Sequence, residues 1–138
     1  MSNIQDLLDA FWGTVITDIQ INILNDSILF NLKSIDDGKV DYDTLEFLDV
    51  SSYYYVKDSK EHRFNFYDRE KRDYLELTSI AFLNKNEEIG SINFKLPLEK
   101  EWSNYYNSNI NIVMEIWEDI LCIEARKVCI NGRTYNLK

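Results

Sequence analysis

Apolar and polar side chains alternate along most of this chain, which is the pattern of half-buried β-strands. In 110–117, isoleucine and methionine occupy every second position. A reversal at Glu118–Asp119 keeps one apolar face by pairing Ile116 with Leu121, Met114 with Ile123 and Ile112 with Ala125. Asn131–Gly132 predicts a second reversal, because a type I′ turn needs positive φ at both central positions. This turn sets Val128 opposite Tyr135, so the C-terminal part is predicted to be an antiparallel meander.

A second meander is predicted from the same alternation in 15–49. Asn25–Asp26 suits a two-residue turn that pairs Ile23 with Ile28, Ile21 with Phe30 and Ile19 with Leu32. Asp37–Gly38 suits another turn, which pairs Phe30 with Leu45 and Ile28 with Phe47. The expected strands are 15–24, 27–35 and 39–49, and Ser51–Ser52 is expected to end the third.

The central part of the chain has a weaker pattern. Strand-type residues resume at 53–56 and at 62–67, and a further strand is expected around Ile92, Phe94 and Leu96. Leu75 and Leu77 change phase to Ile80 and Phe82, which predicts a β-bulge near Thr78–Ser79 or a strand that bends between two sheets.

Helical spacing occurs at two places. Ser2 and Gln5 suit a capping box at the start of an amphipathic helix of about residues 3–12, and Gly13 suits its end. Its apolar stripe consists of Ile4, Leu7, Leu8 and Phe11. Pro97 ends a strand and suits the first turn of a short helix near 98–106.

These elements predict a mainly β (α+β) protein with about eight or nine strands. The antiparallel meanders are expected to form a β-sandwich or a partly open barrel, with the N-terminal helix and the short helix near 98–106 packed on it. The length of 138 residues suits one globular domain, 1–138, with a real hydrophobic core.

The charge and the apolar distribution exclude several functions. A net charge of −9 disfavours binding to nucleic acid, because phosphates would be repelled. There is no apolar run of about 18 residues for a membrane helix. The first residues lack a basic segment followed by an apolar one, so a cytoplasmic protein is expected.

No motif for catalysis or for a metal or cofactor is present. Cys122 and Cys129 lack metal-site spacing and are expected to be reduced packing residues. His62 is the single histidine and has no companion motif, so it is interpreted as a surface residue. The acids of 36–43 do not match a calcium loop, and turn chemistry explains them. We therefore expect a non-enzymatic protein without cofactor or metal.

Two features favour a protein-binding surface. Residues 36–50 hold six acids against one lysine, whereas 57–72 hold six bases against four acids. Tyr53–Tyr55 follows the acidic run, and tyrosine is favoured in interfaces. An ordinary solvated face and a strand covered on both faces are the alternatives. The predicted protein-binding residues are Asp41, Asp43, Glu46, Asp49, Tyr53 and Tyr55.

Three segments carry a resemblance to a known family. They are Phe11–Gly13 leading into Ile19–Ile21, Thr44–Ser52 and Asp119–Ala125. Together they resemble the small, acidic, β-rich YxiG-like proteins of bacilli and the immunity proteins encoded beside polymorphic toxins. The resemblance implies a cytosolic protein that binds and neutralises a cognate bacterial toxin. The net charge of −9 favours a basic domain as the partner. The resemblance transfers no catalytic residue.

Two other functions remain open on the sequence. A small-molecule or lipid-binding β-barrel would use the many aromatic side chains to line a cavity of about 300 Å³ or more. An enzyme would have to be built around His62.

Overall fold

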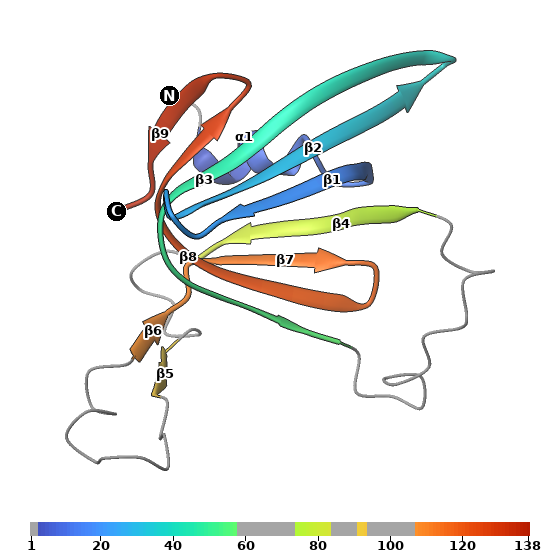
Figure 1. Cartoon of the computed structure of the whole chain (residues 1–138). Coiled ribbons are helices and arrows are strands. Elements are labelled where there is room, and N and C mark those ends of the chain that lie inside the picture. The colour runs from blue at the N-terminus through green and yellow to red at the C-terminus, as the bar shows by residue number, and fades with distance from the viewer. Residues whose placement is uncertain (1–2, 58–73, 84–90, 94–106) are drawn as a thin grey trace.

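The computed structural model describes residues 3–57, 74–83, 91–93 and 107–138. Within them the chain is mainly β, as predicted, with one short helix (Figure 1). The elements are α1 (Ile4–Asp9), β1 (Thr14–Asn22), β2 (Ser27–Asp36), β3 (Lys39–Val56), β4 (Leu75–Phe82), β5 (Ser91–Asn93), β6 (Asn107–Asn109), β7 (Ile112–Ile116), β8 (Asp119–Ile130) and β9 (Arg133–Asn136).

Seven of the strands form one sheet in the order β3-β2-β1-β4-β7-β8-β9, and every pairing in it is antiparallel. The long strand β3 curves around the sheet and also pairs with β8, from Leu45↔Ile130 to Val56↔Ile120 (Figure 1). Strands β5 and β6 form a separate two-stranded sheet. The antiparallel β class is therefore confirmed.

Two of the predicted turns are confirmed with their registers. Asp37 and Gly38 have φ of 49° and 79°, and Asn131 and Gly132 have φ of 49° and 86°. Both central residues are thus left-handed, as a type I′ turn requires. The cross-strand pairs are the predicted ones: Phe30↔Leu45, Ile28↔Phe47 and Val128↔Tyr135.

The β1–β2 register differs from the prediction by two residues. Ile21 pairs with Ile28 and Ile19 with Phe30, so a four-residue loop replaces the two-residue turn at Asn25–Asp26. The loop is anchored by the Asn25 amide donating to the Asn22 side chain at 3.1 Å. Its last carbonyl, on Asp26, accepts from the Val50 amide of β3 at 2.8 Å.

The β7–β8 register also differs by two residues, because the turn is Trp117–Glu118 rather than Glu118–Asp119. The observed pairs are Ile116↔Asp119, Met114↔Leu121 and Ile112↔Ile123. Trp117 sets this turn: its amide donates to the Glu76 carbonyl at 3.2 Å and its indole N–H donates to the Tyr74 carbonyl at 2.8 Å. A shift of two residues leaves each side chain on its predicted face.

Bulges keep the strands paired where the apolar pattern changes phase. The predicted bulge near Thr78–Ser79 is confirmed, since the β4–β7 register shifts between Leu77 and Ser79. The prediction that Ser51–Ser52 ends a strand was wrong. There β3 continues to Val56, with a positive φ at Asp49 and a register shift between Val50 and Ser52.

The N-terminal helix is confirmed but ends earlier than predicted, at Asp9. Its N-cap is Asn3, whose side chain accepts from the Gln5 amide, so the predicted capping role of Ser2 is wrong. Leu8 and Phe11 enter the core cluster, which places α1 against the sheet. Gly13 has φ of 83°, and its amide donates to the Leu77 carbonyl of β4 at 2.7 Å.

The core consists of side chains from α1, β1–β4, β7 and β8, together with Phe11 and Leu137. The largest fully buried ones include Phe30 and Phe47, whose rings pack edge to face with centroids 6.0 Å apart. No helix of the described ranges is long and apolar enough to cross a membrane. The strand expected at 62–67, the helix expected near 98–106 and His62 lie outside the described residues.

Candidate functional site

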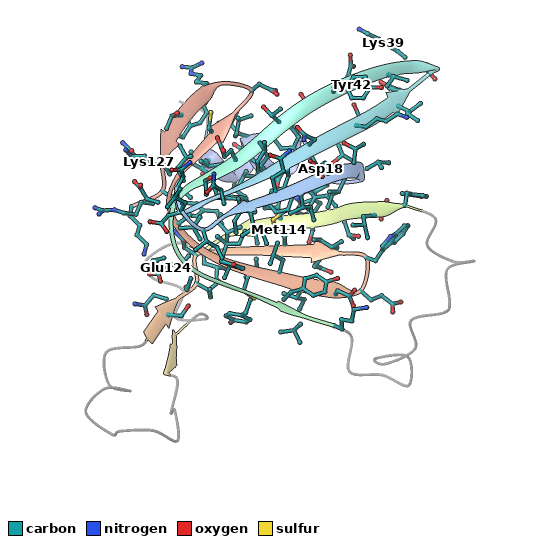
Figure 2. All side chains as sticks on the ribbon, viewed as in Figure 1. Asp18, Lys39, Tyr42, Met114, Glu124 and Lys127 are labelled. Carbon is teal, nitrogen blue, oxygen red and sulfur yellow. The ribbon has the colours of Figure 1, made fainter. Side chains whose placement is uncertain are left out.

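The β2–β3 hairpin extends beyond its neighbouring strands. On β2, the last residue paired with β1 is Lys33, and on β3, the pairing with β8 begins at Leu45. We call the protruding part, Ser34–Asp43, the β2–β3 arm. Figure 2 shows Lys39 and Tyr42 at its free end, away from Met114 inside the sheet.

One face of the arm is apolar and exposed. Ile35 pairs with Val40 across the arm, and Tyr42 pairs with Lys33. Cross-strand partners share a face, so these four side chains lie together on the side opposite to Leu45 and the core. Ile35, Val40 and Tyr42 are 62%, 41% and 73% exposed. Such a cluster is typical of an interaction surface when polar residues surround it.

The other face of the arm is acidic. Ser34 pairs with Asp41 and Asp36 with Lys39, and Asp43 continues this face toward Leu45. It therefore presents three carboxylates and one ammonium group. Asp43 accepts a hydrogen bond from the Asn131 side chain at 2.9 Å, which fixes its position at the base of the arm.

The structure brings together two of the six predicted protein-binding residues. Asp41 and Asp43 share the acidic face, whereas Glu46 lies on the opposite face of β3. Asp49 has a positive φ, and its carboxylate is 3.9 Å from the Lys127 ammonium group. The assignment of all six to a binding surface stays a prediction.

Tyr53 and Tyr55 lie on the other half of β3, beyond the bulge. They pair with Ile123 and Leu121 of β8 and are 39% and 46% exposed. The Tyr55 hydroxyl donates to the Asp119 carboxylate at 2.6 Å. These tyrosines therefore belong to the β3–β8 region and do not extend the arm.

Sequence reasoning missed the apolar face of the arm. The signal was present, because the predicted Asp37–Gly38 turn already set Ile35 opposite Val40. Val40 and Tyr42 fall out of phase with the core residue Leu45. An apolar residue that alternates out of phase with the core residues of its strand is a signal of an interface.

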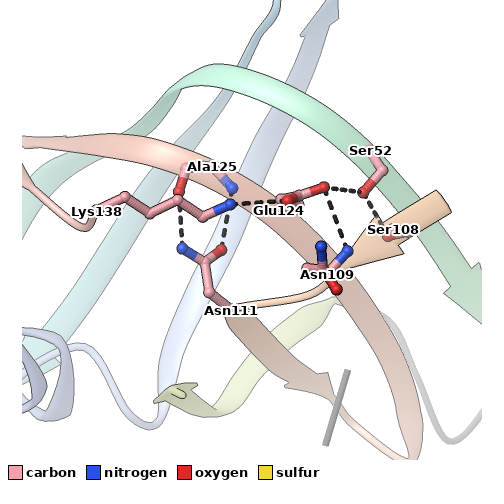
Figure 3. Close-up of polar contacts among 7 residues, drawn as sticks. All are labelled: Ser52, Ser108, Asn109, Asn111, Glu124, Ala125 and Lys138. Atoms are coloured by element: carbon pink, nitrogen blue, oxygen red, sulfur yellow. Dashed lines mark hydrogen bonds and ion pairs between the residues drawn. The ribbon is translucent and has the colours of Figure 1, made fainter. Parts of the chain in front are cut away.

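A second polar cluster surrounds Glu124 on β8 (Figure 3). The Glu124 carboxylate accepts from Lys138 at 2.7 Å, from the Ser52 hydroxyl at 3.2 Å and from the Asn109 amide at 3.3 Å. The hydroxyls of Ser52 and Ser108 are 2.5 Å apart. This cluster joins β3, β6, β8 and the C-terminal segment.

Electrostatics keep Glu124 ionised. Burial alone would raise the pKa of its carboxyl group, but hydrogen bonds from Lys138, Ser51 and the Asn109 backbone outweigh burial and lower it. Beside it, Asn111 exchanges two hydrogen bonds with the backbone of Ala125, at 2.7 and 3.0 Å. Within the described part of the chain, every buried side-chain N or O atom has a partner. We therefore interpret the cluster as a structural connection.

The cysteines are free thiols on adjacent parts of β8, and Cys122 is buried. Burial raises the pKa of the Cys122 thiol. Burial, together with the neighbouring Cys122, raises the pKa of Tyr54 to about 12. In the described ranges no group of three His, Cys, Asp or Glu side chains is placed to hold a metal ion. This leaves the β2–β3 arm as the candidate site.

Comparison with known sequences gives one family. A model of the family described as YxiG-like protein matches residues 4–135, which includes the β2–β3 arm, Glu124 and, apart from the last residue of β9, the described strands. A search of curated proteins gave no match. The match covers almost the whole chain, and it agrees with the resemblance found in the residues. The chain therefore belongs to the YxiG-like protein family.

Proposed function

We propose that this chain is a non-enzymatic binding protein of the immunity type, which neutralises a cognate bacterial toxin by binding it through the β2–β3 arm. The observation that carries the proposal is the pairing of an exposed apolar face, Ile35, Val40 and Tyr42, with an acidic face on the same arm. Aromatic and aliphatic anchors supply most of the binding energy of interfaces, and flanking charges select the partner.

The charge of the arm favours a basic partner. The whole chain carries a net charge of −9, and Asp36, Asp41 and Asp43 add a local negative field. Such a field accelerates the encounter with a positively charged domain, most strongly at low ionic strength. A toxin that acts on nucleic acid has a basic active site, so the proposed inhibition is steric and electrostatic.

The test partner is the toxin domain encoded next to the gene of this chain. Stopped-flow association is measured for the parent protein and for the triple variant D36N/D41N/D43N at low and physiological salt. We expect association about tenfold slower or more at low salt, with a smaller difference at high salt. D6N/D18N/D26N is the matched control, since it changes the charge equally at exposed residues away from the arm. Failure of the parent to bind and inhibit the toxin refutes the proposed function.

We also propose that the sheet forms a partly open barrel. Strand β3, at one end of the row β3-β2-β1-β4-β7-β8, also pairs with β8 at the other end, which links the two ends of this row. The described interior is occupied by side chains such as Phe30, Phe47, Met114 and Ile123, which are fully buried. This packing supports protein binding at the surface over the alternative of a small-molecule or lipid-binding cavity.

We propose the cytoplasm as the location. Cys122 and Cys129 both lie on β8 as free thiols, which suits a reducing compartment.

A further inference from the structure

We infer that the partner binds by strand addition: an extended basic segment of the partner protein pairs with the outer edge of β3 at Lys39–Asp43. This inference rests on the proposed function and specifies how the β2–β3 arm would bind. It follows from the direction of the backbone groups on the arm, from the side chains on its two faces and from the way the chain covers another strand edge.

The position of Thr44 sets the direction of the backbone groups. Its amide donates to the Asn131 side chain at 2.8 Å, and its carbonyl accepts from the Asn131 amide at 3.0 Å. Both groups therefore point away from β2. In an antiparallel pair, the backbone groups of alternate residues point to the same side. The amides and carbonyls of Val40 and Tyr42 thus also point outward, toward solvent.

Among the residues that the structure describes, none pairs with β3 on this side of the arm. Lys39–Thr44 pair with β2, whereas the described part of β8 meets β3 only from Leu45 onward. Asn131 covers the backbone of β3 at Thr44 and leaves the edge of Lys39–Asp43 uncovered. An unpaired edge of this kind is a template for another strand.

By contrast, the chain covers a second strand edge, the end of β4, with side chains that bond its backbone groups. At the end of β4, the Gln5 amide group donates to the Ile80 carbonyl at 2.9 Å and accepts from the Phe82 amide at 2.7 Å. The Trp12 indole N–H also donates to the Ile80 carbonyl, at 3.3 Å. These contacts satisfy backbone groups that would otherwise be open to a strand. No described side chain does the same for Val40 and Tyr42.

The two faces of the arm define the sequence of the added strand. Residues opposite Asp41 and Asp43 would lie beside carboxylates, so lysine or arginine fits there. Residues opposite Val40 and Tyr42 would lie beside exposed apolar side chains, so β-branched or aromatic residues fit there. The expected segment alternates basic and apolar residues over about five positions. This combination of backbone pairing and alternate side-chain contacts is the usual form of β-augmentation.

The probe is a library of 12-residue peptides displayed on phage, with lysine or arginine at every second position and the other positions varied. A matched library carries aspartate or glutamate instead. Binders selected on the parent protein are synthesised and their Kd values are measured for the variants Y42T and Y42P. Both variants remove the ring, but only Y42P removes the outward amide, and neither removes a hydrogen bond to β2.

We expect binders from the basic library alone, and a Kd at least about tenfold higher for Y42P than for Y42T. In the complex, the Val40 and Tyr42 amides should exchange with solvent at least about tenfold more slowly than in the free protein. Equal Kd values for the two variants, or the recovery of no binder from the basic library, overturn the inference.

A second copy of this chain is the competing occupant, because the outer strand β9 carries Arg133 and forms another sheet end. Light scattering of the free protein distinguishes it: a dimer that Y42P dissociates and Y42T does not would overturn binding of a foreign strand. If the toxin of the proposed function binds both variants equally, strand addition fails while that function stands.

Discussion

Asn131 hydrogen-bonds both backbone groups of Thr44, at 2.8 and 3.0 Å, although the two residues belong to different hairpins. Asn131 also has the positive φ that the β8–β9 turn requires. One residue thus combines a turn position with closure of the β3 edge, through its side-chain oxygen and its backbone amide, and it ends the free edge of the arm at Thr44.

Substitution of Asn131 separates these two roles. N131G keeps the left-handed backbone but leaves the Thr44 amide without its partner, which should lower the free energy of unfolding by about 1 kcal/mol. N131A should lower it by about 1–2 kcal/mol more, because an alanine is strained at positive φ. Urea denaturation measures both. If alanine were as stable as glycine here, the turn conformation would not contribute as described.

The stability of the protein should depend on pH through Glu124. Its pKa is lower in the folded protein than the ordinary value of 4.5, so the unfolded chain takes up the proton first as the pH falls. The stabilisation is complete well above pH 4.5 and is lost as the pH falls below it. E124Q should therefore be less stable than the parent near pH 7 and should approach it near pH 3.

Urea denaturation at several pH values compares E124Q with E115Q, whose parent carboxylate is on the exposed part of β7 and accepts from Ser79 at 2.7 Å. A pH dependence that is unchanged by E124Q would show that the Glu124 cluster does not contribute to acid sensitivity.

Removal of the Gln5 side chain should expose the edge of β4. Q5A loses the bonds to Ile80 and Phe82, which should lower the free energy of unfolding by about 1–3 kcal/mol. The opened edge should also raise self-association, as measured by light scattering at increasing concentration. Q20A is the control, because the Gln20 side chain donates to Asp18, two residues away on the same strand. Equal behaviour of Q5A and Q20A would contradict the edge-covering role.

The two thiols should differ in reactivity. Cys122 is 9% exposed and its pKa is raised, so little thiolate is present and reagents reach it poorly. Iodoacetamide at pH 8 should modify C129A, which retains Cys122, at least about tenfold more slowly than C122A. Mass spectrometry follows the reaction. In denaturant the two single-thiol variants should react at similar rates, which controls for intrinsic reactivity.

The turns show which part of the fold a sequence can specify. Asp37–Gly38 and Asn131–Gly132 fixed their registers, because few residues tolerate positive φ at both central positions. Asn25–Asp26 did not, since its loop is held by Val50, a residue of another strand. The β7–β8 turn is likewise set by Trp117 and its contact with Tyr74. A two-residue shift keeps every face, so alternation alone cannot detect it.

The candidate site was only partly predictable for a similar reason. Alternation correctly placed Asp41 and Asp43 on one face of β3. The predicted binding set also included Glu46, which lies on the other face, and Asp49, which lies next to a bulge. The contacts that define the edges, such as Gln5 with Ile80, join residues far apart in the chain. Local sequence patterns carry no information on such pairs, so the edges became visible only in the structure.

The pairing of β3 with β8 has a consequence for synthesis. Leu45 and Ile130 are 85 residues apart in the sequence, so their hydrogen bonds form only after Ile130 has left the ribosome. Until then β3 can pair only with β2, and its apolar side chains lack their contacts with β8. Folding that depends on such distant pairs is slow, on the order of milliseconds to seconds. The nascent chain is therefore expected to be prone to aggregation with other copies until the β8–β9 hairpin has been synthesised.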